Sequence, residues 1–306
     1  MARILFGDGA IGDIIKQLQK ALTTAGFSTN GVDGWYGTGT HNAVSSFQSS
    51  REIPPTGLVD DGLWPILMNS PIPTVAQRAL QLTASFEGHG FGLAEGNFDG
   101  ALLTWGIIGF TMSAGEVQEI VLAINNSHPE IVQQAFASNT DELIGVMQAS
   151  QAAQTTWANR HTLANGSLAE PWKTMFATFG SSPEVQAEQM NHVQSDYMLP
   201  AVHTAKSLGF TSELGLALCF DIHVQDGGID NTAMQQVQQN STPGMAEPDL
   251  RVVVANAVAD RAKPKWSDDV RARKLAIANG QGTVHGHLFV MENCGLSGNF
   301  DAPELA

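Results

Sequence analysis

Apolar residues recur every three or four positions in the first 70 residues, which predicts a unit of short helices. We expect the first helix to end at Gly26, because glycine readily takes the left-handed conformation that closes helices. A turn rich in Gly, Asn and Asp follows at 30–37, Thr40 is placed to cap a second helix, and a third is expected near 64–68. The apolar positions of the first two helices are Ile15, Leu18, Leu22, Ala43, Val44 and Phe47.

From residue 75 onward the pattern is mostly helical. The segment SPIPT at 70–74 has two prolines and no periodicity, so we divide the chain into domains at 1–70 and 71–306. The second domain opens with the stripe Val75, Ala79, Leu82 and Phe86, and later helices are expected near 114–125, 128–136, 139–160, 184–208, 212–225, 249–261 and 267–279. Residues 88–112 are glycine-rich and β-prone, with 102–111 as the strand candidate. The expected fold class is mainly α (α+β): a three-helix module, then a helical domain with a short β excursion.

Composition and charge narrow the function classes. Hydrophobic residues make up 43% and charged residues 15% of the 306 positions, which is typical of a globular protein. The formal net charge of −15 disfavours nucleic acid and anionic lipid as partners and favours a polycation such as chitosan. No apolar run has the length of a membrane span, so no membrane partner is expected.

The N-terminus and the two cysteines bear on localisation. The first residues lack the pattern of a secretory signal peptide, so we expect synthesis in the cytoplasm and, for a wall target, release or injection by another system. Cys219 and Cys294 show no disulfide or zinc spacing. Two buried thiols and one long-range bridge both remain open.

Residues 12–70 resemble the three-helix peptidoglycan-binding domain of bacterial and phage wall hydrolases. The matching positions are Leu18-Gln19, Leu22, Gly26-Phe27, Gly31, Asp33-Gly34, Tyr36-Gly37, Thr40, Ala43-Val44, Phe47-Gln48, Gly57, Asp60, Trp64 and Leu67. The resemblance implies attachment to the wall, not chemistry. Trp35 and Tyr36 are the candidates to stack on a sugar or peptide stem, although either ring can instead belong to the core.

Residues 82–111, LTASFEGHGFGLAEGNFDGALLTWGIIGFT, resemble the active-site segment of family 46 chitosanases, members of the lysozyme-like superfamily. The resemblance implies that Glu87 is one catalytic acid, that Asp99 is the second, and that Thr104 lies five residues further on in the motif. It also implies hydrolysis with inversion at the anomeric carbon. The insert between Glu87 and Asp99 is shorter than in the family, which leaves the cleft shape and the substrate open. Segments 220–229 and 269–286 also look like parts of related hydrolases.

The chemistry of glycoside hydrolysis fits these residues. One carboxyl must be protonated to donate to the leaving oxygen, and a second must be ionised to activate water. Glu87 follows Phe86 on an apolar helix face, which favours the protonated form. Asp99 lies in a polar turn after Asn97, where water and backbone N–H groups favour the carboxylate, and Thr104 can hold the water beside it. Glu95 is the alternative second carboxylate, and Glu95 and Asn97 are otherwise expected to bind substrate.

Other polar clusters carry weaker signals. His285 and His287 can face one side of a strand, but no third ligand stands at a telling distance, so no metal and no cofactor are expected. The basic stretch 261–274 is interrupted by acids and is interpreted as a solvated helix face or as arginines lining a cleft.

Three functions are consistent with the sequence. The first is a monomeric muramidase that cuts the glycan strands of peptidoglycan, as a phage endolysin released through a holin or as an effector with a secretion apparatus and an immunity protein. The second is a chitosanase, which the acidic charge favours. The third is a non-catalytic wall-binding lysis protein, against which the intact acids argue.

Overall fold

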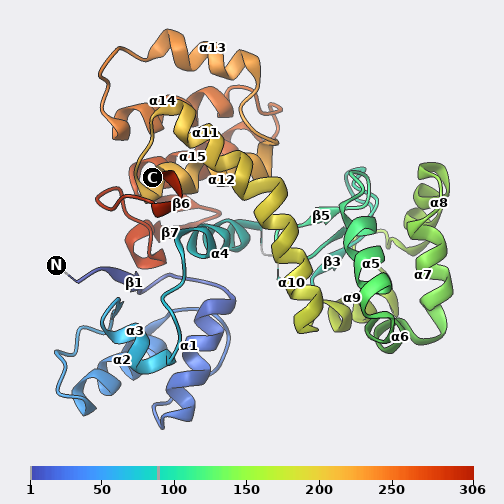
Figure 1. The fold of residues 1–306 in the computed structure, drawn as a ribbon, viewed down its shortest axis with the longest axis horizontal. Helices are drawn as coiled ribbons and strands as arrows, with labels where there is room; N and C mark the ends of the chain where they lie inside the picture. Colours follow the sequence, from blue (N-terminus) through green and yellow to red (C-terminus); the bar gives the residue numbers. More distant parts are fainter. Residues whose placement is uncertain (1, 88–89) are drawn as a thin grey trace. The chain divides into compact units, whose positions relative to one another are not determined.

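The computed structural model describes residues 2–87 and 90–306, and the side chain of Glu87 lies outside the described part. The chain forms two compact units (Figure 1). Unit 1 combines Met1–Phe86 with Tyr197–Ala306, and unit 2 is Glu87–Asp196. None of the helices in the described residues has the length and apolarity needed to cross a membrane.

The N-terminal part of unit 1 contains the three expected helices. Its elements are β1 (Ile4–Phe6), α1 (Asp13–Thr24), α2 (Thr38–Ser50), β2 (Val59–Asp60) and α3 (Leu63–Met68), with β1 antiparallel to β2. The predicted apolar positions are all buried. The prediction that Thr40 caps the second helix is wrong, because α2 already begins at Thr38 after Gly37. The Thr40 hydroxyl instead accepts a hydrogen bond from Gln19 Nε2 at 3.0 Å, inside the module.

The remainder of unit 1 is a helical bundle with a hairpin. It comprises α4 (Val75–Glu87), α11 (Leu199–Leu208), α12 (Glu213–Asp226), α13 (Asn231–Asn240), α14 (Glu247–Ala259), α15 (Ser267–Asn279), β6 (Gln281–Val284), β7 (His287–Val290) and 3₁₀ turns at Met291–Cys294 and Pro303–Leu305. Every residue of α12 from Glu213 to Ile222 is buried, so this helix is the centre of the bundle. Helices α11, α14 and α15 pack around it (Figure 1).

Unit 2 joins a small sheet to a set of helices. It contains β3 (Ala94–Glu95), β4 (Thr104–Trp105), β5 (Phe110–Thr111), α5 (Glu116–Ser127), α6 (Pro129–Phe136), a 3₁₀ turn at Ala137–Asn139, α7 (Thr140–Met147), α8 (Gln151–His161), α9 (Trp172–Gly180) and α10 (Pro183–His192). The single strand predicted at 102–111 is wrong: β4 and β5 form a hairpin, because Gly106 and Gly109 adopt positive φ angles and reverse the chain.

Two of the long predicted helices are interrupted. The one at 139–160 separates into α7 and α8, because buried Gln154 donates to the carbonyl of Val146 at 3.2 Å and so satisfies the end of α7. The one at 184–208 contains a π-helical turn at Val193–Met198, just before Pro200. Proline has no N–H to continue the α-helical bonding, and a wider turn accommodates it.

Two helices were not predicted at all. Helix α13 is mostly polar, with Ala233 and Val237 buried, and it begins where Asp230 accepts a hydrogen bond from the Ala233 N–H at 2.7 Å. Helix α9 carries Phe176 and Phe179, which contact Trp105 in the core of unit 2. Helix α13 has only two buried positions, too few for an apolar period to stand out. In α9, buried Trp172, Phe176 and Phe179 do recur at helical spacing, so the sequence contained a signal for this helix.

Candidate active site

The predicted catalytic acid Glu87 is the last residue of α4, and its side chain lies outside the described residues. The helix that carries it is described in full, and its predicted stripe, Val75, Ala79, Leu82 and Phe86, is buried. The Phe86 ring contacts the ring of Phe289 on β7, with centroids 4.8 Å apart. The guanidinium carbon of Arg273 lies 4.9 Å from the centroid of the Phe86 ring. The residue before Glu87 is therefore held on two sides within unit 1.

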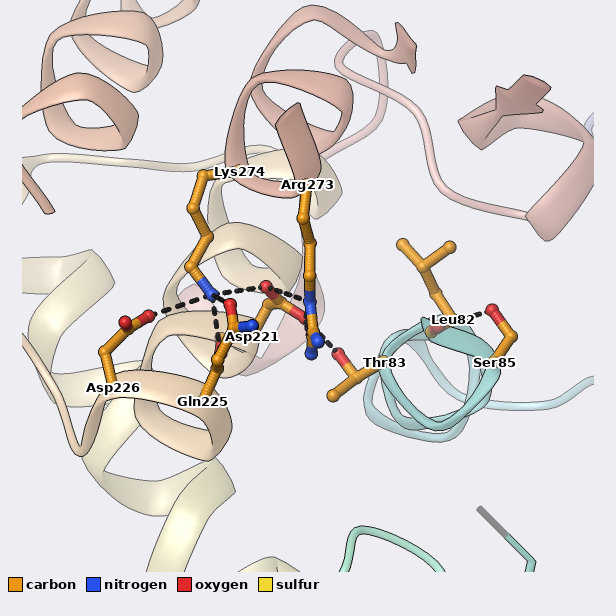
Figure 2. A network of polar contacts seen from close by, with 8 residues as sticks. All are labelled: Leu82, Thr83, Ser85, Asp221, Gln225, Asp226, Arg273 and Lys274. Atoms are coloured by element: carbon orange, nitrogen blue, oxygen red, sulfur yellow. Dashed lines mark hydrogen bonds and ion pairs between the residues drawn. The ribbon is translucent and has the colours of Figure 1, made fainter. Parts of the chain in front are cut away.

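A buried ion network lies beside this end of α4 (Figure 2). Asp221 on α12 is fully buried and accepts hydrogen bonds from Arg273 Nε at 3.0 Å and Nη2 at 2.7 Å. Its other oxygen accepts from Lys274 Nζ at 2.6 Å. Thr83, one helical turn before Glu87, donates to Asp221 Oδ1 at 3.0 Å. The network thus ties the last turn of α4 to α12 and α15.

The charges in this network keep the carboxyl group of Asp221 ionised. Burial alone would raise the pKa of Asp221, but the cations of Arg273 and Lys274 and their hydrogen bonds outweigh it and lower the pKa to about 2. Lys274 also forms an ion pair with Asp226 at 2.9 Å, although burial raises the pKa of Asp226. Two cations, Arg273 and Lys274, therefore pair with two acids, Asp221 and Asp226, beside α4.

Arg273 and Lys274 correct the prediction for the stretch 261–274 and bear on the segments 220–229 and 269–286. The sequence pattern of 261–274 favours a solvated helix face or cleft-lining arginines, yet Arg273 and Lys274 are almost completely buried. The sequence contained a signal for them, since 220–229 and 269–286 resemble related hydrolases. It contained no signal that Asp221 pairs with a residue 52 positions later.

The sheet of unit 2 has one apolar and one polar face. Strand β3 pairs Glu95 with Thr104 on β4, and Thr104 pairs with Thr111 on β5, so these three residues form a row across the sheet. All three are partly exposed. The alternate residues Ala94, Trp105 and Phe110 are buried, and Trp105 stacks on Phe179 with centroids 5.4 Å apart. Because these apolar side chains pack into the core, the row of Glu95, Thr104 and Thr111 (the polar row) lies on the accessible face of the sheet.

Two charged groups flank the polar row. Lys173 Nζ on α9 forms an ion pair with Glu95 Oε1 at 3.2 Å. At the other end, Glu116 Oε2 accepts a hydrogen bond from the Thr111 N–H at 2.8 Å. Thr104 lies between them, with Glu95 as its cross-strand neighbour.

Asp99 lies in the loop that joins β3 to β4. It is exposed, and its Oδ1 accepts a hydrogen bond from the Ala101 N–H at 3.0 Å. Asn97 organises the same loop: its Oδ1 accepts from the N–H groups of Gly100 and Leu102, both at 3.1 Å. Its amide nitrogen donates to Asn159 Oδ1 at 2.7 Å. Asn97, expected to bind substrate, thus has its side chain occupied in holding the loop that presents Asp99.

The two aromatic candidates of the module separate clearly. Tyr36 is fully buried, and its hydroxyl donates to the Gly57 carbonyl at 2.7 Å. The prediction that Tyr36 binds substrate is therefore wrong, because its ring fills the core of the module. Trp35 keeps 38% of its surface exposed, and its ring contacts His287 of the β6–β7 hairpin with centroids 5.6 Å apart.

The histidines of the β6–β7 hairpin and the two cysteines do not come together as metal ligands. His285 lies at the turn between β6 and β7 and pairs with Asp269 at 2.7 Å, and His287 contacts Trp35. Among residues 2–87 and 90–306, no group of three or more His, Cys, Asp or Glu is placed to hold a metal ion. Cys219 and Cys294 are both free and buried, and burial raises the pKa of both thiols.

Comparison with known proteins finds two family matches. Residues 12–67 match a putative peptidoglycan binding domain, and residues 81–250 match glycosyl hydrolase family 46. No curated protein matches the chain.

Solved structures of similar fold are chitosanases. One is a family 46 chitosanase from Gynuella sunshinyii in complex with chitotetraose, at 18% identity and a TM-score of 0.50, covering 72% of this chain and 99% of that one. Another is the native chitosanase from Bacillus subtilis MY002, at 18% identity, a TM-score of 0.53 and the same coverage. A variant of that enzyme, complexed with 6 GlcN, has the same TM-score. At this identity the likeness concerns the fold.

Proposed function

The chain belongs to glycosyl hydrolase family 46, and on this basis we propose that it is an endo-acting hydrolase of the glycan strands of peptidoglycan. The observation that carries the proposal is the union in one chain of a family 46 domain with a module that matches a peptidoglycan binding domain. A catalytic domain attached to such a module is kept at a high local concentration on the wall polymer. Its place of action is then the cell wall.

The proposed reaction uses two carboxyl groups. Glu87 donates its proton to the glycosidic oxygen as the bond to the anomeric carbon breaks. A second carboxylate accepts a proton from a water molecule that attacks the anomeric carbon from the opposite face, which inverts its configuration. Asp99 is the first candidate for this base on its motif position, and Glu95 is the alternative because it is the neighbour of Thr104.

Chitosan is the second candidate substrate. The solved structures of similar fold are chitosanases, one with chitotetraose and one with 6 GlcN bound. A protein of formal net charge −15 attracts a polycation over long range, and chitosan is polycationic. Peptidoglycan remains the first proposal because the N-terminal module has no evident use on a soluble polymer.

One experiment separates the candidates. Wild-type protein and Glu87→Gln are incubated with purified sacculi and, separately, with chitosan, and new reducing ends are measured. We expect the wild type to release reducing ends from sacculi, and we expect Glu87→Gln to lose at least a hundredfold in rate because the proton donor is gone. Release from chitosan alone would establish the second candidate. Release from neither polymer, with sedimentation on sacculi retained, would leave a non-catalytic binding protein.

A further inference from the structure

Trp35 is an exposed aromatic ring on a rigid support. Its backbone N–H donates to Asp33 Oδ1 at 2.9 Å, and its carbonyl accepts from Gln19 Nε2 at 3.0 Å. A Cβ on Gly37 would lie only 2.8 Å from the Trp35 ring, so the indole is packed over this glycine. An aromatic face that is already fixed loses little conformational entropy when a ligand stacks on it.

The partner of this ring comes from the hydrolase part of the chain. His287 at the start of β7 is exposed and contacts the indole, with centroids 5.6 Å apart. The contact is supported by the backbone, because Gly7 N–H donates to the Asn293 carbonyl at 3.0 Å and Asn293 Nδ2 donates to the Asp8 carbonyl at 2.8 Å. The module and the hairpin therefore present Trp35 and His287 together.

Strand β7 connects this pair to the end of α4. Side chains two positions apart on a strand point to the same face, about 6.6–6.8 Å from one another. His287 contacts Trp35, and Phe289 on the same face contacts Phe86, the residue before Glu87. One face of β7 thus leads from the module's exposed tryptophan to the helix end that carries the predicted proton donor.

We propose that Trp35 and His287 form a distal glycan-binding subsite, built jointly by the module and the hydrolase, that holds the polymer strand along β7 on the side away from the end of α4. The proposal rests on the proposed function. The ligand is a β-linked amino-sugar strand, whose ring C–H faces stack on the indole while a hydroxyl or amide group bonds the imidazole. Such a subsite engages long strands and not short oligosaccharides.

The test compares Trp35→Ala and His287→Ala with Trp266→Ala in the full chain. Trp266 is a suitable control because it is also exposed, at 53%, and belongs to the same unit. The substrate is the polymer that the wild type hydrolyses, sacculi or chitosan, and the short substrate is a trisaccharide of the same sugars. For Trp35→Ala we expect the half-saturating concentration of the polymer to rise about tenfold, with kcat and the turnover of the trisaccharide unchanged. His287→Ala should show a smaller rise in the same direction, and Trp266→Ala none.

A second measurement separates this proposal from the proposed function. In the Glu87→Gln background, sedimentation with sacculi or with cross-linked chitosan reports binding without hydrolysis. Weaker sedimentation of Trp35→Ala than of Trp266→Ala supports the subsite even if the wild type hydrolyses neither polymer. Equal binding and equal half-saturation in both variants overturn the subsite while leaving the proposed function in place. Circular dichroism of Trp35→Ala, His287→Ala and Trp266→Ala checks that each variant is folded.

Discussion

At the scale of single residues, Asp221 is a fully buried charge whose carboxylate has several partners. It has no exposed surface, and Arg273 and Lys274 both donate to its carboxylate. A buried charge is costly unless it is paired and hydrogen-bonded, and here the pairing is complete. Because Thr83 on α4 also donates to it, the same carboxylate supports the helix that ends at Glu87.

Replacing Asp221 by Asn is expected to lower the free energy of unfolding by about 3–5 kcal/mol. The variant leaves Arg273 and Lys274 buried without their common counter-charge. Urea unfolding measures the loss, and Lys16→Gln is the control because the Lys16–Asp13 pair is largely exposed and is worth at most about 1 kcal/mol. Similar small losses in both variants would contradict a structural role for the network.

The low pKa of Asp221 also predicts the response to acid. A carboxyl whose folded pKa lies below its unfolded value of about 3.9 stabilises the fold above that pH and loses this contribution as pH falls toward 2. The contribution is about 2–3 kcal/mol. We therefore expect the free energy of unfolding to fall between pH 5 and pH 2.5, and to fall less steeply in Asp221→Asn. Parallel curves for the two proteins would show that other groups govern the acid response.

Asp99 and Glu95 are distinguished by paired substitutions. If Asp99 activates the water, Asp99→Asn should lower kcat at least a hundredfold, whereas Glu95→Gln should lower it about tenfold or less. Glu95 has Thr104 as its cross-strand neighbour, so the reverse order would identify Glu95 as the base. Rates on sacculi and the thermal midpoints of both variants provide the measurement and the check on folding.

At the scale of elements, the β3–β4 loop depends on one side chain. Asn97 closes the loop by accepting from two backbone N–H groups, and Leu102 within it adopts a positive φ of 68°. Positive φ is unfavourable for a residue with a branched side chain, so local bonding must hold the conformation. The sheet itself is fixed from its other face by Trp105.

Removing this bonding is expected to affect activity more than stability. Asn97→Ala should lower kcat about ten- to a hundredfold, because a displacement of about 1 Å at a catalytic carboxylate has such an effect. Ser28→Ala is the control, since Ser28 also accepts from a loop N–H, that of Asn30, but in the N-terminal module. An unchanged kcat in Asn97→Ala would mean that Asp99 needs no fixed position.

At the scale of the whole molecule, the N-terminal module is built into unit 1. Arg3 and Arg78 both pair with Glu213 of α12, which is fully buried, and Ser297 N–H donates to its other oxygen at 3.1 Å. The side chain of Gln81 on α4 donates to the Ile11 carbonyl and accepts from the Ile14 N–H at 3.0 Å. The module therefore contributes to the packing of the hydrolase.

Deletion of residues 1–70 tests this integration. Residues 71–306 alone lose the partner Arg3 and the contacts of β1, so we expect the thermal midpoint to fall by about 10 °C. Turnover of a short soluble oligosaccharide should fall with it. An unchanged midpoint would indicate a module that is only tethered. The division at residue 70 stays a prediction until this experiment is done.

Local patterns were sufficient for much of the molecule. The apolar period predicts the three module helices and α4, because it depends on residues close together in the chain. For the same reason, the motifs at 12–70 and 82–111 identify the peptidoglycan-binding module and the family 46 domain. The identities of Glu87, Glu95, Asp99 and Thr104 as candidates come from the same source. The interruptions of two long helices were not predicted. Pro200 lies within the predicted helix 184–208, directly after the π-helical turn, whereas the bond from Gln154 to Val146 depends on burial that the pattern does not show.

What the sequence alone determined is the kind of protein: a mainly helical hydrolase of family 46 with a wall-binding module and a set of candidate carboxylates. Only the tertiary structure decided that Tyr36 is core and Trp35 exposed, that Asp221 pairs with Arg273 and Lys274, and that Glu95 is the neighbour of Thr104. The physical reason is separation along the chain. Burial and ion pairing depend on which distant segments pack together, and that choice is made by the summed packing of the fold.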